Sequence, residues 1–263
     1  MIKLDMTNAD YHASPGINAT SIKAGRKSPL HMHCEMTKTV DAPTPAMVKG
    51  TLIHMAVLEP HRLDSEIVVC DLNRNTKEFK VLKAENPDAF FLKTSERKEL
   101  DAIRDAALAN DEAQHVLQEY DREVSLFWEG KYGKARARFD CYSPNSIVDV
   151  KSTADINPKF LASTVGKYAY HVQAGWYDEG HRQLNDDNEI TFYFLWIESN
   201  PPYDVCVSEL ASESLALGRM EAVEIATMYR ICEMEGFFPG VGADGVKLLE
   251  VPELYLRNPE VIV

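Results

Sequence analysis

The sequence contains few cysteines, and none of them are spaced for metal binding. Five cysteines occur among 263 residues, an odd number, and no two form a C-x-x-C motif. This usage is typical of free thiols in a reducing cytoplasm. It argues against a zinc ribbon and against a four-cysteine iron–sulfur cluster. We therefore expect a cytoplasmic protein without either kind of site.

Long apolar runs are missing as well. The longest strongly apolar run covers residues 192–197, which is far too short to span a bilayer. No apolar stretch of the secretory type follows residues 1–5. We therefore expect neither membrane attachment nor a secretory signal. Internal repeats and low-complexity segments are also absent from the sequence. The order of elements described below predicts one domain over residues 1–263.

Positive charge is scarce, and the net charge is −13. A protein that coats DNA non-specifically would be basic, so this balance counts mildly against a nucleic-acid partner. An acidic protein that acts on DNA must gather its basic groups locally, in a cleft or channel, because its exterior repels phosphate. The densest basic cluster of the N-terminal part is Lys23, Arg26 and Lys27. It is either a phosphate contact or a solvated helix face.

Two predicted strands joined by a turn stand at the centre of the chain, over residues 136–140 and 147–151. Side chains alternate along a strand, so Arg136, Arg138 and Asp140 should share one face. Asp149 and Lys151 should likewise share a face, with Cα atoms about 6.5 Å apart. If the strands pair antiparallel, Asp140 comes near Asp149 and Lys151 on one polar face.

Two carboxylates and a lysine at a sheet edge suit a hard cation and a water molecule. Carboxylates supply the oxygen ligands that Mg²⁺ requires. A lysine can orient the water or help to deprotonate it, and can offset charge on a phosphate. The alternative is a surface hairpin with its charges in water, which is the commoner case for an arbitrary D-x-K tripeptide. The aspartate that ends the preceding strand, and the apolar residues around D-x-K, favour the site.

The remaining pattern predicts helices, then strands, then helices and strands in alternation. Helices are expected over residues 18–34 with a break near Ser28, and over 46–59, 94–109, 111–120, 168–184 and 212–235. Strands are expected over 66–70, 123–129, 189–198 and 204–210. This order predicts a central mixed β-sheet flanked by helices, an α/β fold with a helical N-terminal region. The parts are residues 1–120, a core over 121–235, and a tail over 236–263.

Three polar residues on predicted helices are further candidates. His54 lies in the middle of the apolar helix over residues 46–59, where a lone histidine is more often a satisfied core residue than a ligand. Gln173 and Tyr177 lie four residues apart and share a helix face. A buried amide needs hydrogen-bond partners, so packing alone explains Gln173 less well.

Together these residues resemble the PD-(D/E)xK nuclease superfamily and, within it, the RecE-type recombination exonucleases of phages and prophages (exodeoxyribonuclease VIII). The resemblance covers nearly the whole chain. It rests on the order of residues 8–12, 17–21 and 28–29, a G-x-x-x-H helix at 50–54, Asp140, D-V-K at 149–151, Y-x-x-Q at 170–173 and Q-x-x-x-Y at 173–177. The superfamily's proline before the first aspartate is Phe139 here, at a position that tolerates change.

The resemblance implies a role for each candidate residue. Asp140, Asp149 and His54 would hold a divalent metal with the backbone of Val150, either Mg²⁺ or Mn²⁺ as a substitute. Lys151 would position and activate the attacking water. Gln173 and Tyr177 would brace the site or contact the DNA backbone. Glu123 would support the metal as an additional acid. Binding of DNA would involve Lys23, Arg26, Lys27, Arg136 and Arg138.

The resemblance also implies a function. Members of the family degrade linear double-stranded DNA from its ends, 5′ to 3′, and leave a 3′ single strand. They form ring-shaped oligomers with a central channel and act with a single-strand annealing protein. A ring with a basic lumen would reconcile an acidic exterior with a DNA substrate. We therefore expect a phage- or prophage-encoded exonuclease in the bacterial host cytoplasm.

Two other functions stay open at this point. One is a structure-specific or endonucleolytic DNase of the same superfamily, with the same site. The other is a non-catalytic DNA-binding or assembly protein with a fossil site, which the net charge of −13 supports. The complete set of acids, lysine and histidine weighs against a fossil, since such a site would be expected to have lost at least one of them.

Overall fold

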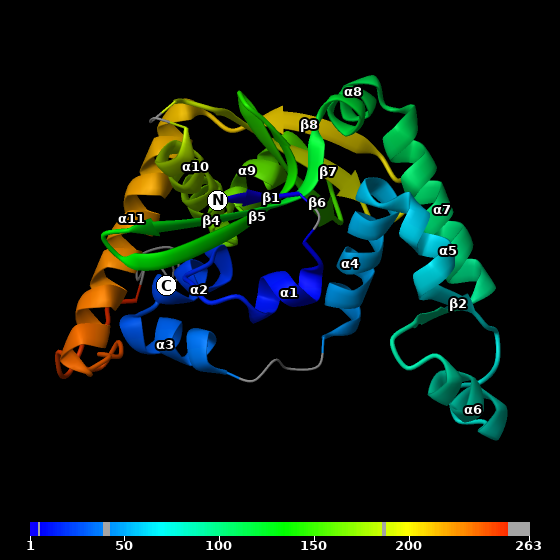
Figure 1. Cartoon of the computed structure of the whole chain (residues 1–263), viewed down its shortest axis with the longest axis horizontal. Coiled ribbons are helices and arrows are strands. Elements are labelled where there is room, and N and C mark those ends of the chain that lie inside the picture. The colour runs from blue at the N-terminus through cyan, green and yellow to red at the C-terminus, as the bar shows by residue number, and fades with distance from the viewer. Residues whose placement is uncertain (5, 39–42, 186–187, 252–263) are drawn as a thin grey trace, which may run out of the picture.

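The computed structural model describes residues 1–251 apart from residues 5, 39–42 and 186–187. A six-stranded sheet of order β1-β4-β5-β6-β7-β8 lies at its centre, with helices on both faces (Figure 1). Neighbouring strands are antiparallel except β6 and β7, which are parallel. The strands are β1 (Ile2–Lys3), β4 (Asp121–Gly130), β5 (Gly133–Ser143), β6 (Ser146–Thr153), β7 (Thr191–Glu198) and β8 (Val205–Glu209). The predicted fold class is confirmed.

Two apolar cores form on the two faces of this sheet. The α10-side core joins β4 and β5 to α2 (Ala19–Gly25), α10 (Tyr170–Leu184) and α11 (Ser212–Glu235). The α4-side core joins β6 and β7 to α4 (Pro45–Leu58), α7 (Thr94–Ala109) and α8 (Asp111–Glu119). Ile53 of α4 is 0% exposed, and burying such a side chain contributes about 1.5–3 kcal/mol. The buried positions of α4 therefore hold His54, the next residue, against the sheet.

Helices α10 and α11 pack backbone to backbone through two glycines. A Cβ on Gly175 would collide with the backbone of Gly218 and Arg219, and a Cβ on Gly218 would collide with the carbonyl of His171. Only glycine permits this approach. Ala169 has a φ of 55°, so α10 begins at Tyr170, two residues after the predicted start. The close packing fixes the face of α10 that carries Gln173.

The N-terminal helices follow the predicted break. Asn18 caps α2 by accepting the N–H groups of Thr20 and Ser21 at 3.0 and 3.1 Å. Ser28 caps α3 (Pro29–Thr37), and Pro29 stands at its first position, where a missing N–H costs nothing. A short helix, α1 (Asn8–Ala13), precedes them.

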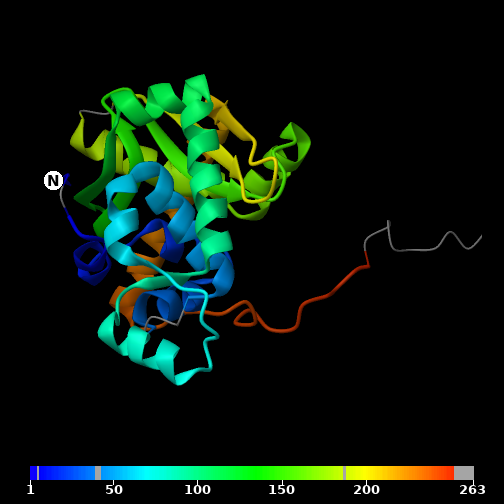
Figure 2. The same cartoon turned by 90° about the vertical axis from the view of Figure 1, so that its right-hand side faces the viewer.

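A small extension departs from the main body after α4. It contains η1 (Pro60–Arg62), α5 (Leu63–Glu66), β2 (Ile67–Val69), α6 (Lys77–Glu85) and β3 (Phe90–Leu92). The strand predicted over 66–70 is β2, and its parallel partner β3 was not predicted. Helix α6 projects below the lower end of α7 (Figure 2). It is held there by Phe79, whose ring lies 5.2 Å from that of Phe91.

The rest of the chain covers the sheet and then leaves it. Helix α9 (Pro158–Lys167) precedes α10, and Gly236, with a φ of 66°, ends α11. Phe238 stacks on His33 of α3 at 3.8 Å between ring centroids, and residues up to 251 then run away from the body (Figure 2). Residues 252–263 of the predicted tail lie outside the described residues. Within the described residues, the helices are too short or too polar to cross a membrane.

Candidate active site

The candidate site lies where β5 and β6 part. The two strands pair at Cys141–Val148, Tyr142–Ile147 and Ser143–Ser146, and the pairing stops there. Beyond it the Val150 N–H donates to Oδ2 of Asp140 at 2.6 Å. A side-chain carboxylate therefore takes the position of a ladder acceptor. This places Asp140 beside the segment that carries Asp149 and Lys151.

The regular alternation of β5 breaks at Asp140. Phe139 packs in the α10-side core, whereas Cys141, two residues later, packs in the α4-side core. On β4 the residue opposite is Glu123, which has a φ of 54° and makes no ladder pair between Arg122–Cys141 and Val124–Phe139. Asp140 therefore lies near Asp149 and Lys151, as predicted, but the prediction that the three share one polar face is wrong. The prediction assumed that side chains alternate regularly along the strand, and the sequence pattern does not show where the backbone departs from that alternation.

Asp140 faces α4 and forms one group with His54 and Glu123. One ligand atom from each of these three residues lies within 4.8 Å of the other two. Nδ1 of His54 is 3.7 Å from Oδ2 of Asp140. The two carboxylates supply the oxygen ligands that suit Mg²⁺ or Mn²⁺, and the imidazole adds one nitrogen ligand of the kind that softer divalent metals prefer. Glu123, expected as a supporting acid, is part of this group, whereas Asp149, expected as a ligand, is not.

The protonation equilibria of this group also fit a cation. Burial, and then the charge of Asp149, raise the pKa of Asp140 to about 7. Burial, and then the charge of Asp140, raise the pKa of Glu123. Burial, and then the charge of Lys151, lower the pKa of His54, so its imidazole is neutral and able to bind a metal. A bound cation would offset the cost of keeping both acids ionised.

Asp149 and Lys151 face α10 and form a second group. Asp149 is 1% exposed, and its Oδ2 pairs with Nζ of Lys151. Its Oδ1 accepts the Gln173 amide at 2.9 Å, and the same amide nitrogen lies 3.2 Å from the Tyr177 hydroxyl. Gln173 and Tyr177 thus brace Asp149, in keeping with their spacing on one helix face.

Lys151 is held as an ammonium ion. Burial lowers its pKa, but the charges of Asp149 and Asp140 outweigh burial and leave the pKa above its ordinary value. Its Nζ also lies 4.7 Å from the ring centroid of Tyr170, a cation–π distance. Tyr170 was not among the predicted site residues, although the Y-x-x-Q spacing contained it. A protonated Lys151 can orient a water or bind a phosphate, but it cannot take up a proton.

The predicted DNA-binding residues are mostly occupied inside the protein. Arg136 is 7% exposed, donates to the carbonyls of Tyr11 and Gly16 and stacks on the Tyr11 ring, which argues against a phosphate contact. Arg138 donates to Glu123, Ser125 and the Met6 carbonyl. Of the α2 cluster, Arg26 pairs with Glu221, Lys27 is exposed, and Lys23 points inward to Gln173.

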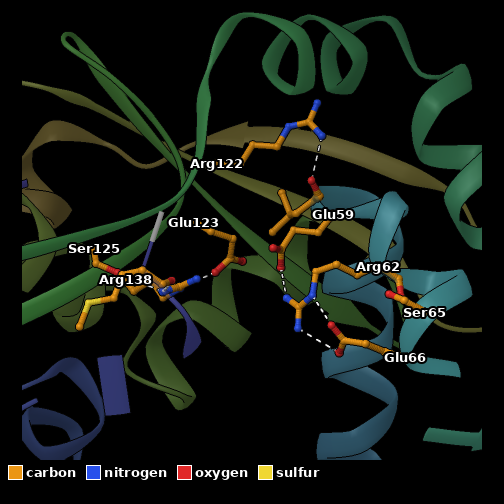
Figure 3. Close-up of polar contacts among 10 residues, drawn as sticks. Glu59, Arg62, Ser65, Glu66, Arg122, Glu123, Ser125 and Arg138 are labelled. Carbon is orange, nitrogen blue, oxygen red and sulfur yellow. Dashed lines mark hydrogen bonds and ion pairs between the residues drawn. The ribbon is translucent and has the colours of Figure 1, made fainter. Parts of the chain in front are cut away.

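Polar contacts fix α4 relative to β4, as Figure 3 shows. Arg122 of β4 donates to the Leu58 carbonyl at the end of α4 at 2.8 Å. Arg62 of η1, which follows α4, forms ion pairs with Glu59 before it and Glu66 after it. Glu123 binds Arg138 on the opposite side, and the charge of Glu59 contributes to its raised pKa. The Arg122 contact, which carries no sequence motif, joins β4 to the end of α4, the helix that presents His54 to Glu123.

One solved structure shows the same fold over nearly the whole chain. It is described as a "putative exonuclease" from Eubacterium rectale, with 15% identity and a TM-score of 0.64, and the alignment covers 95% of this chain and 96% of that one. At this identity the likeness concerns the fold alone. A phage-related exonuclease from Haemophilus somnus aligns at 12% identity over 86% of this chain and 99% of that one, with a TM-score of 0.36, too low to carry an argument.

The family comparison concerns the sequence itself. Curated proteins give no match to this chain. The family described as "PDDEXK-like domain of unknown function (DUF3799)" matches residues 18–244. These residues include both groups of the candidate site and all strands from β2 to β8. The chain therefore belongs to this PDDEXK-like family and has the fold of the PD-(D/E)xK nuclease superfamily.

Proposed function

We propose that the chain is a divalent-metal-dependent exodeoxyribonuclease that degrades linear double-stranded DNA 5′ to 3′ and leaves 3′ single strands for annealing. The observation that carries the proposal is the meeting of two groups where β5 and β6 part. One is the carboxylate–imidazole group of His54, Glu123 and Asp140, and the other is the Asp149–Lys151 pair. The PDDEXK-like family and the description of the Eubacterium rectale protein support a nuclease. Direction and the role in recombination rest on the resemblance to RecE-type enzymes.

The reaction is hydrolysis of a phosphodiester bond. A water oxygen forms a bond to phosphorus, the bond from phosphorus to a sugar oxygen breaks, and a proton is transferred to that oxygen. His54, Glu123 and Asp140 would hold the cation. When bound, Mg²⁺ supplies polarisation of the phosphate and an acidified water. The Lys151 ammonium, fixed by Asp149, presents positive charge to the phosphate and orients the water, because it carries three N–H donors and no acceptor.

The acidic exterior bears on how DNA reaches this site. With a net charge of −13, the chain as a whole repels a duplex. A ring-shaped homo-oligomer with a basic lumen, acting with a single-strand annealing protein, would overcome this repulsion. We include both in the proposal on the strength of the resemblance.

The test uses purified protein with linear and closed-circular duplex DNA, labelled at the 5′ or 3′ end, with Mg²⁺ or with EDTA. We expect the 5′ label to be lost from linear DNA only, and only with metal. Cutting of the circle would replace the exonuclease by an endonuclease. Absence of cleavage with both Mg²⁺ and Mn²⁺ would contradict the proposal and favour a non-catalytic DNA-binding protein.

A variant of Lys151 checks that the cleavage belongs to this site. Lys151→Gln keeps an N–H donor for Asp149 but removes the positive charge. We expect cleavage to fall by about 10²–10³-fold, the usual cost of removing one charge-stabilising donor. Circular dichroism and the unfolding midpoint should show a folded protein. Wild-type activity in this variant would show that the cleavage arises elsewhere.

A further inference from the structure

Lys23 lies within the candidate site although it comes from the N-terminal helix α2. Its Nζ donates to Oε1 of Gln173 at 3.0 Å and lies 5.6 Å from the ring centroid of Tyr170. Lys151 approaches the same ring at 4.7 Å. The structure gives Lys23 no carboxylate within ion-pair distance among the described residues. Its strongest polar contact is therefore the Gln173 amide.

The chemistry of the lysine fixes which end of that amide it contacts. Burial, and then the charge of Lys151, lower the pKa of Lys23 to about 8, so at neutral pH the side chain is mainly an ammonium ion. An ammonium group carries donors only, which is why the amide oxygen of Gln173 faces it. The amide nitrogen then faces Oδ1 of Asp149 at 2.9 Å and the hydroxyl of Tyr177 at 3.2 Å. Half a turn of the amide would bring its oxygen against the Asp149 carboxylate and its nitrogen against Lys23, so both groups favour the observed orientation. Without Lys23 the amide is held from the Asp149 side alone.

The carboxylate of Asp149 depends on this orientation. Its Oδ1 is held by Gln173 and its Oδ2 by Lys151. Asp149 is almost fully buried, so water cannot replace a missing donor. A rotated Gln173 amide would leave Oδ1 without its donor and let the carboxylate move together with Lys151.

We propose that Lys23 is a positioning residue, which orients the Gln173 amide and through it the Asp149–Lys151 pair. The inference rests on the proposed function for its kinetic consequence, while the contacts themselves do not depend on it. A lysine on α2 could instead bind the DNA backbone, as the sequence alone allowed. The two roles differ in what they change, because a positioning residue acts on kcat and a phosphate contact acts on KM and on salt dependence.

The test is a double-mutant cycle with Lys23→Met, Gln173→Ala and the double variant. We expect each single variant to lower kcat about tenfold or more with KM nearly unchanged, and the double variant to be no worse than Gln173→Ala. Lys23→Arg, which keeps the donors, should recover part of kcat. Lys131→Met, at an exposed lysine of the β4–β5 turn, is the matched control for removal of one charge and should match the wild type.

Two outcomes would overturn the inference. One is a raised KM and a weaker salt dependence with unchanged kcat in Lys23→Met, which would make Lys23 a DNA contact. The other is full additivity of the two single variants. The same cycle in urea unfolding needs no DNA, and coupling between Lys23 and Gln173 is expected there too. If the protein cleaves no DNA but the effects of the two substitutions on the unfolding free energy are coupled, the proposed function alone is rejected. If those effects are additive, the role of Lys23 is rejected.

Discussion

At the scale of single residues, the site contains acids that are costly to ionise. Asp140 has an ordinary pKa of 3.8, raised to about 7 first by burial and then by the charge of Asp149. The pKa of Glu123 beside it is raised for the same kind of reason. Between pH 4 and pH 7 the folded protein therefore retains a proton on Asp140 that the unfolded chain releases. Without a cation, this difference lowers stability as the pH rises.

The expected fall of stability with rising pH gives a prediction for Asp140→Asn in EDTA. The stability that the protonated carboxyl contributes is complete below pH 3.8 and is lost as the pH rises through about 7. The unfolding free energy of the wild type should thus fall between pH 5 and pH 8 by up to a few kcal/mol relative to the variant, because each pKa unit corresponds to about 1.4 kcal/mol. Urea unfolding at several pH values measures the difference.

Metal provides the control for that prediction. Mg²⁺ or Mn²⁺ should raise the midpoint of the wild type more at pH 8 than at pH 5.5, since cation and proton compete for Asp140. Asp140→Asn should lose most of this gain. Parallel pH profiles of wild type and variant would show that Asp140 titrates normally.

At the scale of elements, the contact between α10 and α11 sets the face that carries Gln173 and Tyr177. Gly175→Ala would place a methyl group against the backbone of Arg219, which cannot rotate away as a side chain can. We expect the unfolding free energy to fall by about 3 kcal/mol or more, at the upper end of overpacking effects. The urea midpoint measures it.

Gly166 of α9 is a matched control for this change. It is also helical, and a Cβ there would meet nothing within 4 Å. Gly166→Ala should leave stability unchanged or raise it by about 0.5–1 kcal/mol, because alanine loses less backbone entropy. Equal effects of the two substitutions would mean that α10 and α11 are not in backbone contact.

At the scale of the whole molecule, the question is where an acidic protein binds DNA. Helix α6 projects from the body, and residues 71–85 hold four basic residues and three acidic residues. Its lysines Lys77, Lys80 and Lys83 are exposed. This small local excess of positive charge contrasts with the net charge of −13 and faces solvent, where a duplex can approach it.

The variant Lys77→Gln with Lys80→Gln tests whether α6 binds the duplex. We expect KM to rise and kcat to stay the same. The slope of log KM against log salt should fall by up to about two, because each lysine that neutralises a phosphate adds about one to that slope. The pair Lys131→Gln and Lys134→Gln, exposed in and beside the β4–β5 turn, removes the same charge as a control. Equal effects of both pairs would indicate net charge alone.

Most elements were predictable from the sequence because their signals are local. Asn18, Ser28 and Pro29 mark helix starts, and Gly236 marks a helix end through its positive φ. Strands β4 to β8 have apolar patterns that match their burial. The parallel pair β2–β3 was only half predicted, because each strand spans three residues and finds its partner across the whole of α6.

The sequence by itself determined the fold class and brought His54, Asp140, Asp149, Lys151 and Gln173 into consideration, since helix and strand periods and motif spacing are local properties. The tertiary structure alone decided how they group. The broken alternation at Asp140, the positive φ of Glu123 and the Arg122 contact to α4 turn Asp140 toward His54 and Glu123. The tertiary structure also brought Lys23 to Gln173, 150 residues away in the sequence. Such contacts depend on how layers pack, and packing distances are not encoded in any single window of sequence.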